Sequence, residues 1–185
     1  MNALQLRLQV LMVVTTMLLF VAMMALNEWL WARLEFVRGI NWIYLPAGIR
    51  LLSTLLFAEA GAFGLLLVSG LVAYFYYFPD DLTRSMAGGI LSALAPYSIY
   101  RWAQHRYGLQ ASLANLTPAK LLGLIVAYSI ASPLLHCIWF ALNGQENLLQ
   151  GLVVMFIGDL TGTLLVIYTV KAALSLLPSR LPRTR

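Results

Sequence analysis

Long apolar segments, separated by short polar breaks, run through most of the chain. A membrane-spanning helix needs about 20 consecutive, mainly apolar residues to cross the hydrocarbon core of a bilayer. Six candidate segments cover 8–29, 43–58, 61–78, 83–101, 118–142 and 148–174. The pattern predicts an all-α, polytopic transmembrane helical bundle of about six spans. We expect one integral membrane domain over 1–185, ending in a short basic tail at 175–185.

Polar residues and prolines between these segments indicate where helices begin and end. Residues 59–61 predict a turn between the second and third spans. Asp80 or Asp81 is a candidate N-cap for the fourth span, because a carboxylate accepts hydrogen bonds from the first free amide groups of a helix. Thr117-Pro118 predicts the start of the fifth span, since proline is tolerated in the first turn of a helix.

The composition supports the membrane assignment and limits what the charge can mean. The chain is 61% hydrophobic and only 10% charged, with a mean hydropathy of +0.82, whereas soluble domains are typically about 25% charged. The net charge of +5 therefore indicates membrane topology rather than nucleic-acid binding. One cysteine, Cys137, excludes an internal disulfide and a multi-cysteine metal cluster.

The basic residues predict an orientation for the bundle. With the N-terminus inside, eight basic residues fall in cytoplasmic segments and three in outer segments. This bias predicts an even number of spans with both termini in the cytoplasm. The outer stretch 28–42 has two interpretations, a short amphipathic helix on the membrane surface or a polar loop with interfacial aromatic residues.

Three ionisable residues lie inside predicted spans, where a charge costs about 2.5 kcal/mol or more. Helical rise places Arg50 roughly 10 Å and His136 roughly 9 Å from the outer boundary, with Asp159 roughly 16 Å deep. Arg50 is the predicted partner of Asp159, because a buried, hydrogen-bonded ion pair would satisfy both groups. Three interpretations stay open: a pair that fixes helix register, a ligand-binding or proton-coupled site, and a protonated, unpaired Asp159.

Backbone features accompany these residues. Pro46 and Gly48 lie at the start of the second span, where free amide groups of a helix N-terminus could face a cavity or an anion. Gly158 and Gly162 flank Asp159 at a spacing of four residues, which predicts close approach of a neighbouring helix.

The sequence favours a protein that is not an enzyme. Ser132, His136 and Cys137 could suggest a nucleophile, but adjacent histidine and cysteine side chains point about 100° apart on a helix. The serine also lacks the G-x-S-x-G surroundings of a nucleophile elbow. A lone histidine is a poor metal site, so we expect neither a metal nor another cofactor.

Two segments resemble the bacterial membrane-associated sensor (MASE-type) domain, which is found at the N-termini of histidine kinases and diguanylate cyclases. In "NWIYLPAGIRLLSTLLF" the similar positions are Trp42, Pro46, Gly48 and Ile49. In "GDLTGTLLVIY" they are Gly158, Asp159, Gly162 and Leu164. The chain departs from the family in lacking the closing proline and in having Arg50 at a small apolar position. It also has about six predicted spans where the family has about eight.

The resemblance implies a non-catalytic, sensor-like or scaffold module that binds a small ligand, recruits a signalling partner, or does both. It also implies a multi-pass protein of the bacterial cytoplasmic (inner) membrane. No catalytic output domain follows within this sequence, so we expect a stand-alone module. Its expected partners are the lipid bilayer and a membrane or cytoplasmic protein, or further copies of itself, and not nucleic acid. The alternatives are a small solute transporter or substrate-binding subunit of a vitamin-type importer, and a purely structural assembly factor.

Overall fold

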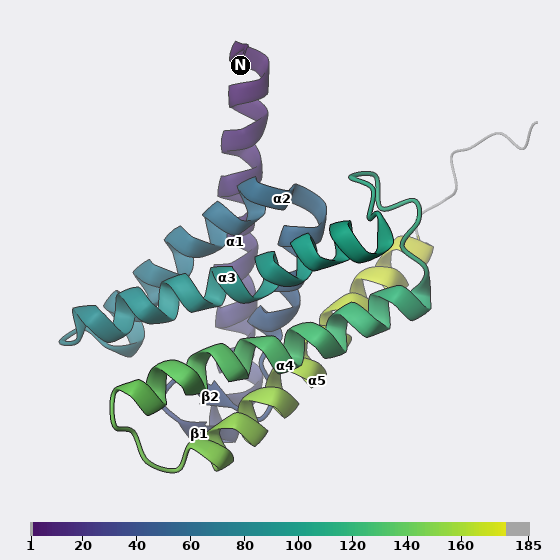
Figure 1. The fold of residues 1–185 in the computed structure, drawn as a ribbon. Coiled ribbons are helices and arrows are strands. Elements are labelled where there is room, and N and C mark those ends of the chain that lie inside the picture. The colour runs from purple at the N-terminus through teal and green to yellow at the C-terminus, as the bar shows by residue number, and fades with distance from the viewer. Residues whose placement is uncertain (1, 177–185) are drawn as a thin grey trace, which may run out of the picture.

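The computed structural model describes residues 2–176, which are almost entirely helical. Its helices are α1 (Ala3–Trp31), α2 (Leu45–Val72), α3 (Leu82–Tyr107), α4 (Pro118–Leu142) and α5 (Leu148–Leu176) (Figure 1). A five-residue π-helical turn, Ala73–Tyr77, extends α2. Helices α1, α2, α4 and α5 are long and apolar enough to span a membrane, whereas α3 does not meet that criterion. The all-α class is confirmed, and the four apolar helices support the membrane assignment by their length and composition. Six spans and the orientation of the termini stay predictions.

Several helix ends follow from local sequence. Asp81 is the N-cap of α3, and its carboxylate accepts a 2.8 Å hydrogen bond from the Arg84 amide. Thr117 caps α4 in the same way, directly before Pro118. Gly108 ends α3 in the left-handed conformation, with φ of 58°, which glycine adopts without a Cβ clash. Of the predicted tail 175–185, residues 175 and 176 still belong to α5, and 177–185 lie outside the described residues.

Helix α2 is broken near its middle. Ala58 has φ of 50° and ψ of −122°, outside the helical region. A Cβ at Gly61 would overlap the carbonyl of Ser53, so the chain after the break returns against the chain before it. The fold-back is visible at the α2 label in Figure 1. The break lies one residue before the turn that the sequence predicts at 59–61.

The segment between α1 and α2 is not helical along its whole length. A single 3-10 turn, Ala32–Leu34, leads into a small antiparallel hairpin of β1 (Glu35–Val37) and β2 (Ile40–Asn41). The amphipathic surface helix considered for 28–42 is therefore wrong beyond the end of α1. Gly39 explains the difference, because its φ of +83° suits a tight hairpin turn and would strain a helix.

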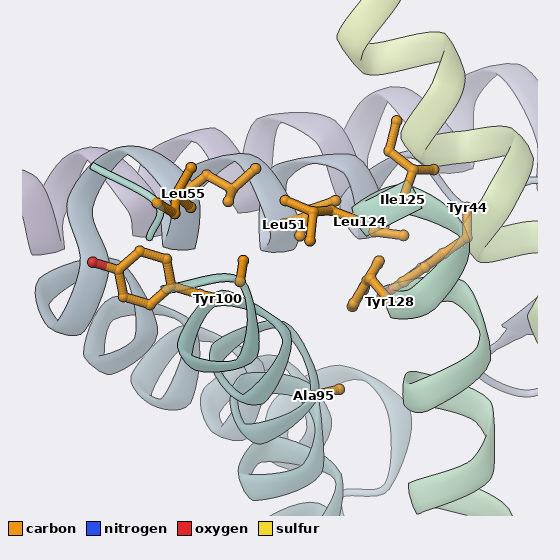
Figure 2. Packing of buried hydrophobic residues seen from close by; sticks show 11 residues of the cluster. Tyr44, Leu51, Leu55, Ala95, Tyr100, Leu124, Ile125 and Tyr128 are labelled. Carbon is orange, nitrogen blue, oxygen red and sulfur yellow. The ribbon is translucent and has the colours of Figure 1, made fainter. Parts of the chain in front are cut away.

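Two apolar clusters hold the helices together. One joins α2, α3 and α4 and contains Leu51, Leu55, Tyr100, Leu124 and Tyr128, as Figure 2 shows. The other lies where α1 meets α2, α3 and α5. The side chains of α1 that are buried recur every three or four residues, at Thr16, Phe20, Met24 and Asn27. A single stripe of α1 therefore packs on the protein, and its first turns project beyond the other helices (Figure 1).

Candidate functional site

An extended segment, residues 41–44, connects the hairpin to α2 and lies directly against the middle of α5. A Cβ at Gly158 would overlap the carbonyl oxygen of Asn41, and one at Gly162 would overlap the carbonyl of Tyr44. The Tyr44 amide donates a 3.1 Å hydrogen bond to the Gly158 carbonyl. The two glycines thus admit an extended backbone, whereas the sequence predicts close approach of a helix.

Helix α2 begins inside the protein. Gly162 is fourteen residues into α5, roughly 21 Å along it, and the start of α2 lies beside this glycine. The part of α2 before Ala58 is only thirteen residues, roughly 20 Å long, whereas the hydrocarbon core of a bilayer is about 30 Å thick. Non-helical backbone at such depth must be enclosed by protein or line a polar cavity.

The first amide groups of α2 are already paired. The Leu45 amide donates a 2.9 Å hydrogen bond to Oδ1 of Asn27 on α1, in a fully buried setting. Pro46 has no amide hydrogen, and the Ala47 amide donates to the Tyr44 carbonyl at 3.1 Å. Of the residues in this turn, only Tyr44 lines the adjacent cavity. The sequence predicts that free amide groups near Pro46 and Gly48 could face a cavity or an anion, but the amides of Leu45 and Ala47 are already paired within the protein.

A cavity of about 90 Å³ lies between the extended segment and helices α1 to α5. A single water needs about 10–15 Å³ on the same measure, so the space exceeds that of one solvent molecule several times. Five polar side-chain atoms of its lining are buried and have no hydrogen-bond partner in the protein. They are Nδ2 of Asn41, Nε of Arg50, Oγ of Ser69, the hydroxyl of Tyr77 and Nε of Arg84.

Three arginines reach this cavity, and aromatic rings hold them in place. The Arg50 guanidinium lies 5.4 Å from the ring centre of Phe20 and 5.1 Å from that of Tyr44. Arg84 stacks 3.9 Å above Phe78, and Arg38 lies 4.9 Å from Tyr76. Such cation–π contacts orient a guanidinium by its face. The N–H groups at its edge then remain able to donate hydrogen bonds.

The predicted direct pair of Arg50 and Asp159 is not formed. Both residues are buried, with 8% and 4% of their surface exposed. The one ion pair among the described residues joins Arg101 to Glu59 elsewhere in the fold. Arg50 instead donates to the hydroxyl of Tyr44 at 3.3 Å. Tyr44 ends the extended segment beside Arg50, and the sequence alone does not place it there.

Asp159 lies on α5 outside the cavity, and further buried polar side chains lie on α4 and α5. Its Oδ2 atom has no hydrogen-bond partner in the protein, and neither do the hydroxyl groups of Ser132, Tyr128 and Thr163. Asp159 is close enough to Arg50 and Ser132 for both to act on its carboxylate. It does not line the cavity. The three sequence-predicted ionisable residues are therefore divided, because Arg50 and His136 line the cavity and Asp159 lies outside it.

His136 and Cys137 are adjacent on α4 but have different surroundings. His136 lines the cavity, and its Nδ1 donates to the Ser132 carbonyl at 2.8 Å. The Cys137 thiol lies 3.7 Å from the Leu148 carbonyl. No group of three or more histidine, cysteine or acidic side chains that could hold a metal occurs within residues 2–176.

Several residues of the site escape sequence reasoning. In the sequence, Arg38 and Arg84 look like ordinary charged residues near the ends of predicted spans. Asn27 looks only like the polar end of an apolar segment. A signal for Asn27 exists, because it continues the stripe of Phe20 and Met24 at helical spacing. Asn41 and Ser69 have no comparable signal, since their role depends on the fold-back of the chain around the cavity.

No protein-family model, curated protein or solved structure matches this chain. The resemblance to MASE-type sensor domains therefore stays a prediction. The arguments below rest on the geometry of the cavity and its lining residues.

Proposed function

We propose that the protein is a non-catalytic membrane module that binds a small polar ligand in the cavity and passes its occupancy to a signalling partner. The supporting observation is that five residues lining one cavity each have a buried polar side-chain atom without a hydrogen-bond partner in the protein. A buried polar group without a hydrogen bond costs about 1–3 kcal/mol. Five such groups in one place would be a large cost unless the cavity contents complete their hydrogen bonds.

A second function, solute transport or substrate capture for an importer, is favoured by the broken start of α2. Transporters of several folds bind substrate beside discontinuous helices near the middle of the membrane. Here α2 is interrupted at Ala58, and its start and the extended segment 41–44 lie against the middle of α5. Uptake of the bound molecule by proteoliposomes would support transport, whereas binding without uptake would support the sensor-like module.

The test of ligand binding uses a variant that fills the cavity. Gly88 lines the cavity, and the nearest atom to a Cβ at this position would be the Ala73 methyl at 4.0 Å. Gly88→Leu should therefore occupy the space without displacing backbone. Gly123→Leu is the matched control, because nothing lies within 4 Å of a Cβ there.

Small molecules released from the purified, denatured protein would be compared by mass spectrometry among the wild type and these two variants. A molecule that is enriched with the wild type and Gly123→Leu, and lost with Gly88→Leu, would support the proposal. Identical profiles from all three proteins would contradict the proposal, because they would mean that the cavity holds only water.

A further inference from the structure

The cavity is rich in hydrogen-bond donors and positive charge. Arg38, Arg50 and Arg84 all line it, and no aspartate or glutamate lines it with them. The whole chain contains only twelve lysines and arginines, so three around one small space is a marked concentration. Arg50 is buried, Arg84 is half-buried and Arg38 is exposed, so the positive charge extends from the interior to the mouth of the cavity.

Three of the unpaired atoms are hydrogen-bond donors, so they need acceptors as partners. Nε of Arg50, Nε of Arg84 and Nδ2 of Asn41 are donors and cannot accept a hydrogen bond. They therefore cannot satisfy one another, however the side chains turn. Water molecules can accept from such donors one by one, whereas a carboxylate or phosphate brings several acceptor oxygens and the opposite charge in one group.

The remaining walls are aromatic. Phe20, Tyr44, Phe78, Trp139 and Phe140 contribute rings to the lining. A bare inorganic ion would leave these rings facing empty space, whereas a compact apolar body would pack against them. The donors and the rings therefore fit two ends of one small molecule.

We propose that the cavity binds a small organic anion, with its carboxylate or phosphate between Arg50, Arg84 and Asn41 and its apolar body against the aromatic rings. This inference rests on the proposed ligand-binding function and names the chemical class of the ligand. The anionic group has two sources, a free organic acid or the phosphate of a lipid headgroup.

The test compares probes of the same shape and different charge. Benzoate, benzamide and benzylammonium would be titrated into the full-length protein in a non-ionic detergent, with phenyl phosphate as a second anion. Thermal unfolding and calorimetry would report binding. We expect benzoate or phenyl phosphate to stabilise the protein and to bind more weakly as chloride is added, while benzamide and benzylammonium have no effect.

The matched variants are two arginines of the same helix. Arg84→Gln removes a cavity donor near the start of α3, and Arg101→Gln removes an exposed arginine near its end, outside the cavity. Losing a hydrogen bond to a charged group should weaken anion affinity about tenfold or more for Arg84→Gln. Arg101→Gln should bind like the wild type. Because Arg84 is less buried than Arg50, its variant keeps the test independent of a folding defect.

Nanodiscs with and without phosphatidylglycerol separate the two sources of the anion. Stabilisation by this lipid that Arg84→Gln abolishes and benzoate competes away supports an anion site filled by a lipid headgroup. Stabilisation by the soluble anions alone supports a free organic acid.

Two results would overturn the inference. Either anionic probes and phosphatidylglycerol fail to stabilise the wild type, or they bind equally to Arg84→Gln and Arg101→Gln. If a neutral or cationic molecule is then found with the wild type and lost with Gly88→Leu, ligand binding stands and only the anion assignment fails. If Gly88→Leu also changes nothing, the proposed function fails as well.

Discussion

Replacing Gly162 with alanine should destabilise the fold, because the added methyl group has nowhere to go. At this position on α5, a Cβ overlaps the carbonyl of Tyr44 and lies 2.9 Å from the Leu45 nitrogen. These are backbone atoms, so no side-chain rotation relieves the overlap. The extended segment would have to move away from α5, which would also disturb the 3.1 Å hydrogen bond from Tyr44 to Gly158.

The expected magnitude follows from two opposing effects. Overpacking costs about 1–3 kcal/mol, and the rigid backbone contact favours the upper end. Alanine in place of glycine in a helix recovers up to about 1 kcal/mol. A net loss of about 2 kcal/mol should lower the melting temperature by roughly 4–8 °C for a chain of this length.

The assay is thermal unfolding in detergent, followed by tryptophan fluorescence, with Gly123→Ala as the control. Gly123 lies on α4 with nothing within 4 Å of a Cβ, so alanine there should leave the melting temperature unchanged or raise it slightly. Equal melting temperatures for Gly162→Ala and Gly123→Ala would refute the close contact between α5 and the extended segment.

The remaining predictions use the same unfolding assay or simple labelling. Asn27→Ala should cost about 1–3 kcal/mol, because it leaves the buried first amide of α2 unpaired; an unchanged melting temperature would contradict this cap. Glu59→Gln should change stability by less than about 1 kcal/mol, since its ion pair is exposed, and a larger loss would count against that geometry. A double-mutant cycle of Arg50→Leu and Asp159→Leu should give a coupling energy well below the about 3–5 kcal/mol lost on breaking a direct buried pair; coupling of that size would show a pair. Ser112→Cys in a cysteine-free background should react with an impermeant maleimide only from the cytoplasmic side; labelling from outside would reverse the predicted topology.

The helices could be predicted from the sequence because their causes are local. The length of each apolar segment predicts where a helix runs. Asp81 and Thr117 predict the starts of α3 and α4, because one side-chain oxygen is sufficient to cap a helix. The turn near 59–61 was also accessible, since a charged residue followed by glycine interrupts an apolar segment. These features need no knowledge of what packs against them.

The start of α2 could not be predicted, because it is a tertiary property. Pro46 correctly indicates a first helical turn, but nothing nearby in sequence reveals that this turn lies against the middle of α5. That position depends on Asn27, eighteen residues earlier, and on the glycines at 158 and 162, more than a hundred residues later. Counting the helical rise from an assumed outer boundary therefore predicts how deep Arg50 lies, but it does not predict which residues surround Arg50.

The roles of the charged residues could not be predicted for a related reason. A loop arginine that orients a membrane protein and one that reaches a cavity have the same sequence signature. Arg38 and Arg84 are distinguished only by the rings of Tyr76 and Phe78 on which they stack. The sequence likewise places Asp159 and Arg50 as the two deep charges of opposite sign, which makes pairing the economical hypothesis. In the structure, Arg50 instead donates a hydrogen bond to Tyr44 and lines the cavity.

The extended segment links the cavity to the rest of the fold. Its backbone carbonyls rest on the glycines of α5, while the side chains of Asn41 and Tyr44 line the cavity on the other side. An anion held by Asn41 and Arg50 would therefore act on the same few residues that set the distance between α2 and α5. Arg50 also acts electrostatically on Asp159 without touching it, so drawing the guanidinium toward an anion would change the surroundings of that carboxylate.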